Sequence, residues 1–214
     1  LYRTMDALTT AFPEVLFEGC SGGGGRFDAG ILYYMPQIWT SDNTDAVSRL
    51  TIQYGTSLVY PISMTTAHVS AIPNHQTGRK TSFETRGNAA MSAVFGYELD
   101  LTKMSQEDKD QVKEQVACYK EIRKLIQYGN FYRLKSPVET NQSAWMFVSD
   151  DKRDVCVMTF QVLAFAQPCL TKTKLFGLDP ELEYENLETH EIFGGDELME
   201  LGFYDPIVHQ DYTS

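Results

Sequence analysis

Apolar, strand-like runs alternate with helix-like patterns through the first half of the chain, and this alternation restricts the fold most. Residues 15–20 (VLFEGC) and 37–41 (QIWTS) predict buried strands, and residues 44–55 predict a helix after the second of them. Strands that alternate with helices at this spacing are typical of a parallel α/β arrangement. The sequence therefore predicts a parallel sheet whose strands are joined by helices.

The helix predicted at 44–55 carries signals at both ends. Thr44 or Asn43 is the expected N-cap, and Gly55 is the expected last residue. The stripe that would face the sheet consists of Val47, Leu50 and Tyr54.

Further elements follow in the same alternation. Residues 81–94 predict a helix capped by Thr81 or Ser82, and a long amphipathic helix is expected from its N-cap Ser105 to Gly129. The stripe of that long helix is Val112, Val116, Tyr119, Ile122 and Ile126. Strands are expected at 57–61, around 67–72 and at 95–101.

The sequence pattern changes after Gly129. Residues 144–165 predict two strands around the polar turn DDKRD, and short strands with Gly and Pro turns follow. We therefore expect two domains, 1–129 and 130–214, the second a small antiparallel β-sandwich.

The first domain supplies only about three or four strands, which would leave open sheet edges in an isolated α/β domain. A closed (β/α)8 barrel needs roughly 200 residues or more. We therefore expect residues 1–129 to form the C-terminal part of such a barrel, including its final helix. The chain also starts inside a helical pattern, at Leu1 and without Met, which favours a missing upstream segment.

Charge narrows the choice of ligand. With 18 Lys and Arg against 29 Asp and Glu, the net charge is −11, which argues against nucleic acid and against an anionic membrane surface. A neutral sugar is compatible with it, and no apolar run approaches the roughly 20 residues of a membrane span. The four cysteines show no C-x-x-C spacing and predict reduced thiols in a cytoplasmic protein.

The glycine run in CSGGGGR, from Cys20 to Arg26, lies between two predicted strands, so a flexible linker is a weak explanation. No Lys-Ser/Thr follows for a phosphate-binding loop, and no helix pattern opens for a dinucleotide site. The remaining explanation is a backbone that a ligand approaches closely. The run follows a strand, and the C-terminal ends of the strands carry the active site of parallel α/β barrels.

Acidic residues follow the next strand. Asp42 comes directly after Trp39–Ser41 and is a candidate catalytic carboxylate or the helix cap, whereas Asp45 suits a capping or dipole role. Trp39 offers a flat apolar surface that could face a sugar ring. Arg26 and Asp28 could pair across the glycine loop, and core packing is the preferred role of Tyr33 and Tyr34.

The stretch LFEGCSGGGGRFDAGILYYMPQIWTSDNTDA closely resembles the signature of microbial α-galactosidases of glycoside hydrolase family 36. RLTIQYGTSLVYP, HVSAIPNHQTGR and GYELDL follow in the family's order, and FYRLKSP, LFGLDP and GGDELMELGF are similar to its C-terminal β domain. The resemblance covers nearly the whole chain.

The resemblance implies a retaining double displacement on terminal α-linked galactose, as in melibiose, raffinose and stachyose, with one nucleophilic carboxylate and one acid/base carboxyl. Asp42 would be the acid/base and a substrate contact, and Cys20 and the backbone N–H of Gly23 would contact galactose hydroxyls. The reaction needs no metal and no cofactor, and family members are often homo-oligomers. The four histidines show no metal-ligand spacing.

The chain departs from the family in one respect. The family's nucleophile lies in a Lys-Trp-Asp motif, and this chain contains no such motif; Glu18 does not match it. We therefore expect the isolated chain to be inactive. Alternatives are an α-N-acetylgalactosaminidase or galactosyl transferase of the same family, and a non-catalytic sugar-binding or assembly fragment.

Overall fold

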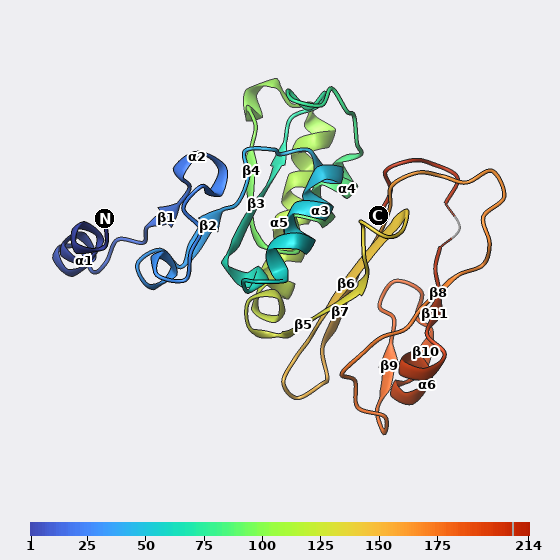
Figure 1. Ribbon diagram of the computed structural model, residues 1–214. Helices are drawn as coiled ribbons and strands as arrows, with labels where there is room; N and C mark the ends of the chain where they lie inside the picture. Colours follow the sequence, from blue (N-terminus) through green and yellow to red (C-terminus); the bar gives the residue numbers. More distant parts are fainter. Residues whose placement is uncertain (207) are drawn as a thin grey trace. The chain divides into compact units, whose positions relative to one another are not determined.

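A computed structural model describes residues 1–206 and 208–214, which form two compact units, Leu1–Tyr119 and Lys120–Ser214 (Figure 1). Helix α5, Gln106–Tyr128, runs through the point of division. The domain division after residue 129 stays a prediction.

The described residues of the first unit form one parallel sheet in which the strands lie in chain order, β1-β2-β3-β4. Trp39 of β2 lies opposite Thr66 of β3, and His68 of β3 lies opposite Gly96 of β4. The bounds are β1 Glu18–Gly19, β2 Gln37–Trp39, β3 Thr65–Ser70 and β4 Val94–Glu98. Because the strands are parallel, their C-terminal ends meet at one edge, which gathers the loops that follow them.

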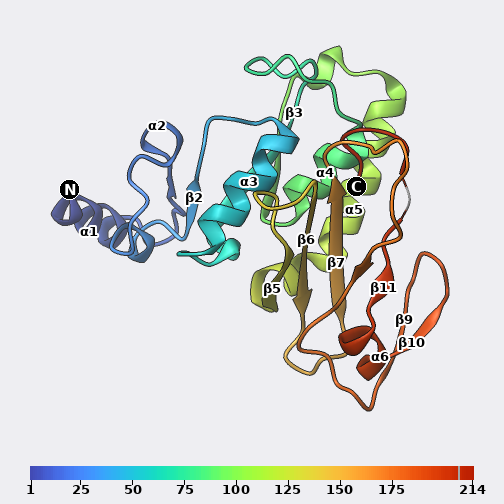
Figure 2. The ribbon, with the colours of Figure 1, turned by 45° about the vertical axis from the view of Figure 1, so that its right-hand side comes forward.

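Helices connect these strands as the alternation predicts. Helices α3 and α4 contact β3, and the two views in Figures 1 and 2 show them running alongside the sheet. The helices of this unit besides α5 are α1 Tyr2–Ala11, α2 Ser21–Gly24, α3 Ala46–Ser57 and α4 Phe83–Met91, with short 3-10 turns at Ile31–Tyr33, Ile62–Met64 and Leu101–Lys103.

The core of the first unit lies between β3 and the helices that cover it. Its buried members are Ala67, Val69, Phe83, Ala90 and Ala93. Val112 of α5 packs against this cluster, and Ile126 of the same predicted stripe is buried, which agrees with the amphipathic pattern of the long helix. Ser105 caps α5 as expected, because its hydroxyl accepts a hydrogen bond from the Asp108 N–H at 3.0 Å.

Two predictions around α3 are wrong. Asp45 is the N-cap, because its carboxylate accepts from the Ser48 N–H at 2.9 Å, and neither Thr44 nor Asn43 has this role. Gly55 lies inside the helix, which continues to Ser57.

The strand predicted at 57–61 does not form. Ser57 ends α3, and residues 58–60 make a turn before the 3-10 turn Ile62–Met64. Leu58 and Val59 are exposed, whereas the apolar run in the sequence predicted that they would be buried in a strand. Local composition cannot distinguish these two outcomes.

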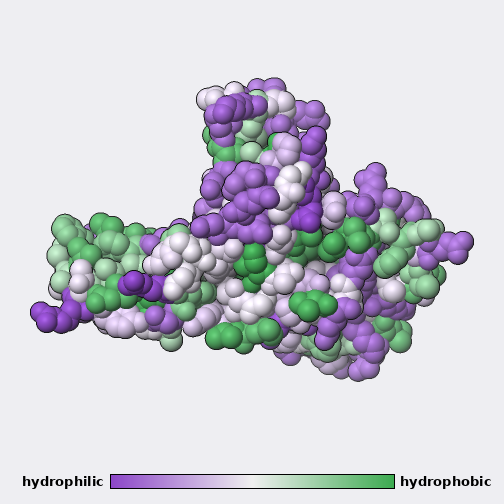
Figure 3. All heavy atoms as spheres, turned by 45° about the horizontal axis from the view of Figure 1, so that its top comes forward, coloured by the Kyte–Doolittle hydropathy of each residue, from purple (hydrophilic) through white to green (hydrophobic). Residues whose placement is uncertain are grey.

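The N-terminal segment of the first unit exposes apolar side chains. Helix α1 contains no buried residue, and Figure 3 shows apolar surface gathered over this segment at the left. Its exposed large apolar residues are Leu1, Tyr2, Phe12, Val15 and Leu16. Tyr33 is also exposed, so the core position expected for it is wrong.

The second unit is built on an antiparallel sheet in the order β5-β6-β7. The two strands predicted around DDKRD are β6 Gln142–Val148 and β7 Val155–Gln161, and β5 Asn130–Lys135 joins them as a strand that the sequence did not identify. Two short pairs complete it: β8 Lys172–Thr173 with β11 Phe203–Tyr204, and β9 Glu183–Glu185 with β10 Ile192–Gly194.

The second unit also contains a helix where only strands were expected. Helix α6 spans Gly195–Glu200, and its Leu198 is buried against Met146 and Leu175. Acidic residues at its start favour the helical form, because they complement the positive end of the helix dipole.

No helix among the described residues is long and apolar enough to cross a membrane.

Candidate functional site

The site predicted from the sequence lies where β1 and β2 end. These strands pair in parallel, with Gly19 opposite Ile38, so the loops after them leave the sheet side by side. The first loop holds Cys20 and the glycines, and the second holds Asp42. Their proximity follows from strand pairing alone.

The glycine loop is a left-handed turn. Gly22, Gly23 and Gly24 have φ values of 71°, 70° and 86°, and Ser21 before them has φ 54°. The N–H of Gly24 donates to the Cys20 carbonyl at 2.7 Å and closes the turn. Residues with a Cβ rarely adopt this conformation, which explains why consecutive glycines occur here.

The glycines also lie against the second loop. A Cβ on Gly23 would be 2.9 Å from the backbone nitrogen of Asp42, and one on Gly24 would be 2.7 Å from the Thr40 carbonyl oxygen. Within this chain the group that approaches the glycines is the turn 40–42, and the close approach of a ligand stays a prediction. Gly23 and Asp42, two of the predicted site residues, are in contact.

The Asp42 side chain is exposed, and one of its oxygens is held. The Trp39 Nε1 donates to Asp42 Oδ1 at 3.0 Å, whereas Asp42 Oδ2 lies on the side of the glycine loop, 3.4 Å from a Cβ built on Gly23. Since Asp45 caps α3, Asp42 is not used as a helix cap, and its carboxylate is available for chemistry.

Hydrogen bonds fix the rest of this loop. The Asn43 N–H donates to Ser41 Oγ at 3.1 Å, and the Asp45 N–H donates to Asn43 Oδ1 at 3.0 Å. Asp45 also pairs with Arg79, whose loop follows β3. A part-buried ion pair and two local turns therefore hold the loop that carries Asp42.

Arg49 of α3 lies beneath the same loop and is almost fully buried. Its guanidinium donates to Thr40 Oγ1 at 3.2 Å and to the Ser41 carbonyl. Burial lowers the pKa of Arg49 to about 10, although the charges of Glu98 and Asp42 act in the opposite direction. The guanidinium is therefore protonated at neutral pH and provides a fixed positive charge near Asp42.

Trp39 does not offer the open surface expected for a sugar. Trp39 is 8% exposed as a residue. Its ring stacks on His68 at a centroid distance of 4.5 Å, and Arg49 Cζ lies 4.2 Å from the ring centroid. With only 8% of Trp39 exposed, these groups and their neighbours leave no open face of the indole for a sugar.

Asp28 shapes the glycine loop without Arg26. Its carboxylate accepts from the Tyr2 hydroxyl at 2.6 Å and from the Ile31 N–H at 2.9 Å. The hydrogen bond from Tyr2 and the backbone bond from Ile31 lower the pKa of Asp28. The pairing expected with Arg26 is replaced by these contacts.

The remaining candidates have simple environments. Cys20 is exposed at the edge of the glycine loop, and all four cysteines are free thiols. Glu18 accepts hydrogen bonds from Gln37 and Thr66, so its carboxylate is engaged within the sheet. In the part of the chain that the structure describes, no three His, Cys, Asp or Glu side chains form a group suited to a metal ion.

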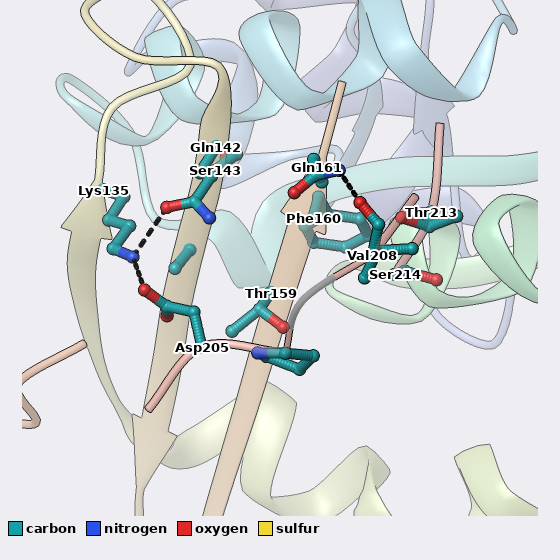
Figure 4. A pocket seen from close by; sticks show the side chains of 12 residues that line it. Lys135, Gln142, Ser143, Thr159, Phe160, Gln161, Asp205, Val208, Thr213 and Ser214 are labelled. Carbon is teal, nitrogen blue, oxygen red and sulfur yellow. Dashed lines mark hydrogen bonds and ion pairs between the residues drawn. The ribbon is translucent and has the colours of Figure 1, made fainter. Parts of the chain in front are cut away.

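The second unit contains a hollow of its own (Figure 4). Lys135 bridges Asp205 at 2.5 Å and Gln142 at 2.8 Å on one side of it, and Gln161 donates to the Val208 carbonyl on the other. Because its lysine and aspartate already neutralise each other, we assign no function to it.

Sequence reasoning missed Arg49 and His68. The buried face of α3 consists of Ala46, Arg49, Leu50 and Gln53, a helical spacing that places two polar side chains inward. That spacing could have indicated from the sequence that Arg49 points inward, whereas no sequence pattern indicated the environment of His68 in β3.

Two family models match the chain. The melibiase model matches residues 1–129, and the model of the glycosyl hydrolase family 36 C-terminal domain matches residues 142–214.

Curated relatives match over the whole chain. It is 66% identical to alpha-galactosidase 1 of Pediococcus pentosaceus and 59% identical to alpha-galactosidase AgaA of Geobacillus stearothermophilus, in each case over 214 residues. The chain spans 29% of the length of these two proteins.

Solved structures of alpha-galactosidases resemble this chain in fold as well as in sequence. A variant of AgaA from Geobacillus stearothermophilus in complex with raffinose superposes with a TM-score of 0.96 at 58% identity, covering 99% of this chain and 29% of that one. The galactosidase domain of the alpha-galactosidase–sucrose kinase AgaSK gives a TM-score of 0.96 at 47% identity, covering 99% of this chain and 30% of that one. The expected fold class, the C-terminal part of a (β/α)8 barrel followed by an antiparallel β domain, is confirmed. With its first 129 residues matched by the melibiase model, the chain belongs to the melibiase family of glycoside hydrolases.

Proposed function

We propose that the protein containing this chain is a retaining α-galactosidase that releases terminal α-linked galactose from melibiose, raffinose and stachyose. The observation that carries the proposal is the contact between the glycine loop and the Asp42 loop at the C-terminal edge of two neighbouring parallel strands. Relatives of this chain are alpha-galactosidases, and solved relatives hold raffinose and stachyose.

Asp42 is the acid/base residue in this proposal. Its carboxyl protonates the glycosidic oxygen as the bond to galactose breaks, and it later takes a proton from the water that releases galactose. Cys20 and the Gly23 N–H bind galactose hydroxyls beside it. The consecutive glycines support this role, because no side chain stands between their backbone and a sugar.

The nucleophile comes from a part of the protein outside this chain. Retaining enzymes hold their two carboxyl groups about 5–5.5 Å apart. The chain has no Lys-Trp-Asp motif, and the carboxylate of Glu18 is engaged by Gln37 and Thr66. The isolated 214-residue chain should therefore give no turnover of an aryl α-galactoside.

The proposal also includes a cytoplasmic homo-oligomer that works without a metal or cofactor and binds neither nucleic acid nor membrane. The net charge of −11 and the free cysteines support the compartment and the neutral ligand. Size-exclusion chromatography with light scattering on the full-length protein tests the oligomer, and a monomeric mass contradicts it.

Kinetics of the full-length protein test the reaction. Asp42→Ala should lower kcat/KM for raffinose by about 10² to 10⁴, because a sugar leaving group needs protonation, and should affect an aryl α-galactoside with an acidic phenol much less. Asp28→Asn is the matched control: it alters a carboxylate of the other loop and should not change the ratio between the two substrates. Equal losses on both substrates in Asp42→Ala contradict the acid role.

The substrate is tested in the same assay. Faster turnover of an aryl α-N-acetylgalactosaminide, or transfer of galactose to another sugar in place of hydrolysis, would favour the alternative activities. Binding of galactose by the isolated chain, measured by calorimetry, would favour a sugar-binding module.

A further inference from the structure

A row of residues in contact crosses three parallel strands and ends at Asp42. Gly96 of β4 lies opposite His68 of β3, His68 stacks on Trp39 of β2, and Trp39 donates its indole N–H to the Asp42 carboxylate. The first two contacts join neighbouring strands, and the last joins β2 to the loop that follows it, so the row crosses the sheet before it reaches Asp42.

The contact with Asp42 is specific to one oxygen. Trp39 Nε1 reaches Asp42 Oδ1 at 3.0 Å, and Oδ2 faces the glycine loop. An N–H donated to Oδ1 favours the form of the acid with its proton on Oδ2, because the carbonyl oxygen of a carboxylic acid is the better acceptor. The indole therefore selects the oxygen that gives and takes the proton and directs it toward the loop.

The indole can do this because its ring is fixed. His68 stacks on it at 4.5 Å with 23° between the planes, and the Arg49 guanidinium lies 4.2 Å from its centroid. Arg49 also holds Thr40 and Ser41, so one buried group fixes both the ring and the backbone that leads to Asp42. A cation over an indole is favourable, and more so when water is excluded.

Gly96 makes room for His68. A Cβ on Gly96 would be 2.7 Å from His68 Cδ2, closer than van der Waals contact permits. The imidazole therefore lies against bare backbone on one side and against the indole on the other. Its Nδ1 lies 3.5 Å from Glu98 Oε2.

We propose that Trp39 is a positioning residue for Asp42, and that Arg49 and His68 hold its ring in place, His68 through the space left by Gly96. This proposal rests on the acid/base role of Asp42. In the first step the proton leaves Asp42 Oδ2 for the glycosidic oxygen, the bond to galactose breaks and galactose joins the nucleophile; in the second, water replaces the nucleophile and its proton returns to Oδ2.

The decisive variant is Trp39→Phe in the full-length protein. It keeps an aromatic ring beside His68 and Arg49 and removes the N–H together with part of the indole, so benzothienylalanine, which keeps the bicyclic shape, is measured beside it. We expect kcat/KM for raffinose to fall by about 10-fold to 100-fold, through kcat, and that of an aryl α-galactoside with an acidic phenol to change by less than about threefold. A ring that served as a sugar platform would instead raise KM for both substrates alike.

A double-mutant cycle tests the row behind the indole. Gly96→Ala and His68→Ala should each lower raffinose turnover more than aryl galactoside turnover. In the His68→Ala background, Gly96→Ala should have little further effect, because the side chain it collides with is gone. Additive losses would show that Gly96 acts independently of His68 and would contradict the proposal that Gly96 makes room for His68.

Two controls separate the possible failures. If Trp39→Phe unfolds, replacing Trp39 with benzothienylalanine keeps the shape of the indole and still removes the N–H. If Asp42→Ala lowers raffinose turnover selectively but the Trp39 variants do not, the positioning proposal is wrong and the proposed function stands. If Asp42→Ala shows no selectivity, the proposed function fails first.

Discussion

Replacing Gly23 with alanine should damage the site far more than the same change at Gly22. Both glycines have nearly the same φ, 70° and 71°. A Cβ on Gly22 meets nothing within 4 Å, whereas one on Gly23 meets the Asp42 backbone nitrogen at 2.9 Å and its Cγ at 3.3 Å. Comparing Gly22→Ala with Gly23→Ala therefore separates the effect of backbone strain, which both variants share, from the effect of the collision with Asp42, which only Gly23→Ala has.

The energetic cost of Gly23→Ala has two parts. A left-handed φ costs alanine about 1–2 kcal/mol, and this part is common to both variants. The collision adds about 1–3 kcal/mol at Gly23, or moves Asp42 by several tenths of an ångström. Since a misplacement of about 1 Å can cost about 100-fold in rate, we expect Gly23→Ala to lower kcat/KM for raffinose by about 10-fold to 100-fold.

The assay is steady-state kinetics of both variants of the full-length protein, with thermal unfolding as a check of folding. Gly22→Ala should stay within about threefold of the parent, because its added methyl group points into open space. Equal losses in the two variants would refute the reasoning, since the collision at Asp42 would then contribute nothing beyond the shared strain.

Three further predictions concern stability. Gly55→Ala should raise the free energy of unfolding by about 0.5–1 kcal/mol in urea denaturation, because Gly55 lies inside α3 with open space around it; a loss would contradict the helix bounds. Asp45→Asn should cost about 1 kcal/mol less than Asp45→Ala, because asparagine keeps the N-cap while losing the ion pair with Arg79; equal losses in urea would refute this. Burial alone would raise the pKa of Asp205, but hydrogen bonds led by that of Lys135 outweigh it and lower the pKa from the ordinary 3.8. The ionised group therefore stabilises the fold above about pH 4, and this contribution is lost as the pH falls through the folded-state pKa. Asp205→Asn should lower the free energy of unfolding by about 3 kcal/mol at pH 7, and this loss relative to the parent should shrink below about pH 4. A loss that does not change with pH would refute the assignment.

Long, periodic elements were the most predictable from the sequence. Helix α5 begins after its predicted cap Ser105, and Ile126 of its predicted stripe is buried, because spacing along a helix is a local property. The run 57–61 failed for the opposite reason: whether Leu58 and Val59 pair as a strand depends on neighbours that are distant in the sequence.

The candidate site divides in the same way. The glycines and Asp42 could be located because each follows a predicted strand, and parallel strands bring such loops to one edge, whereas Cys20 was a candidate only through the family resemblance. The environment of Trp39 could not be predicted: the sequence suggested an open ring beside Asp42, and the structure leaves no open face of the indole for a sugar.

By itself, the sequence determined the strand–helix alternation of the first unit, the long helix α5, the glycine run between two strands, and the family that the chain resembles. Only the tertiary structure decided what the glycines touch, which oxygen of Asp42 is held, and how Gly96, His68 and Trp39 line up behind it. The physical reason is that backbone preferences act between near neighbours, whereas this row runs across the sheet and joins residues through strand register.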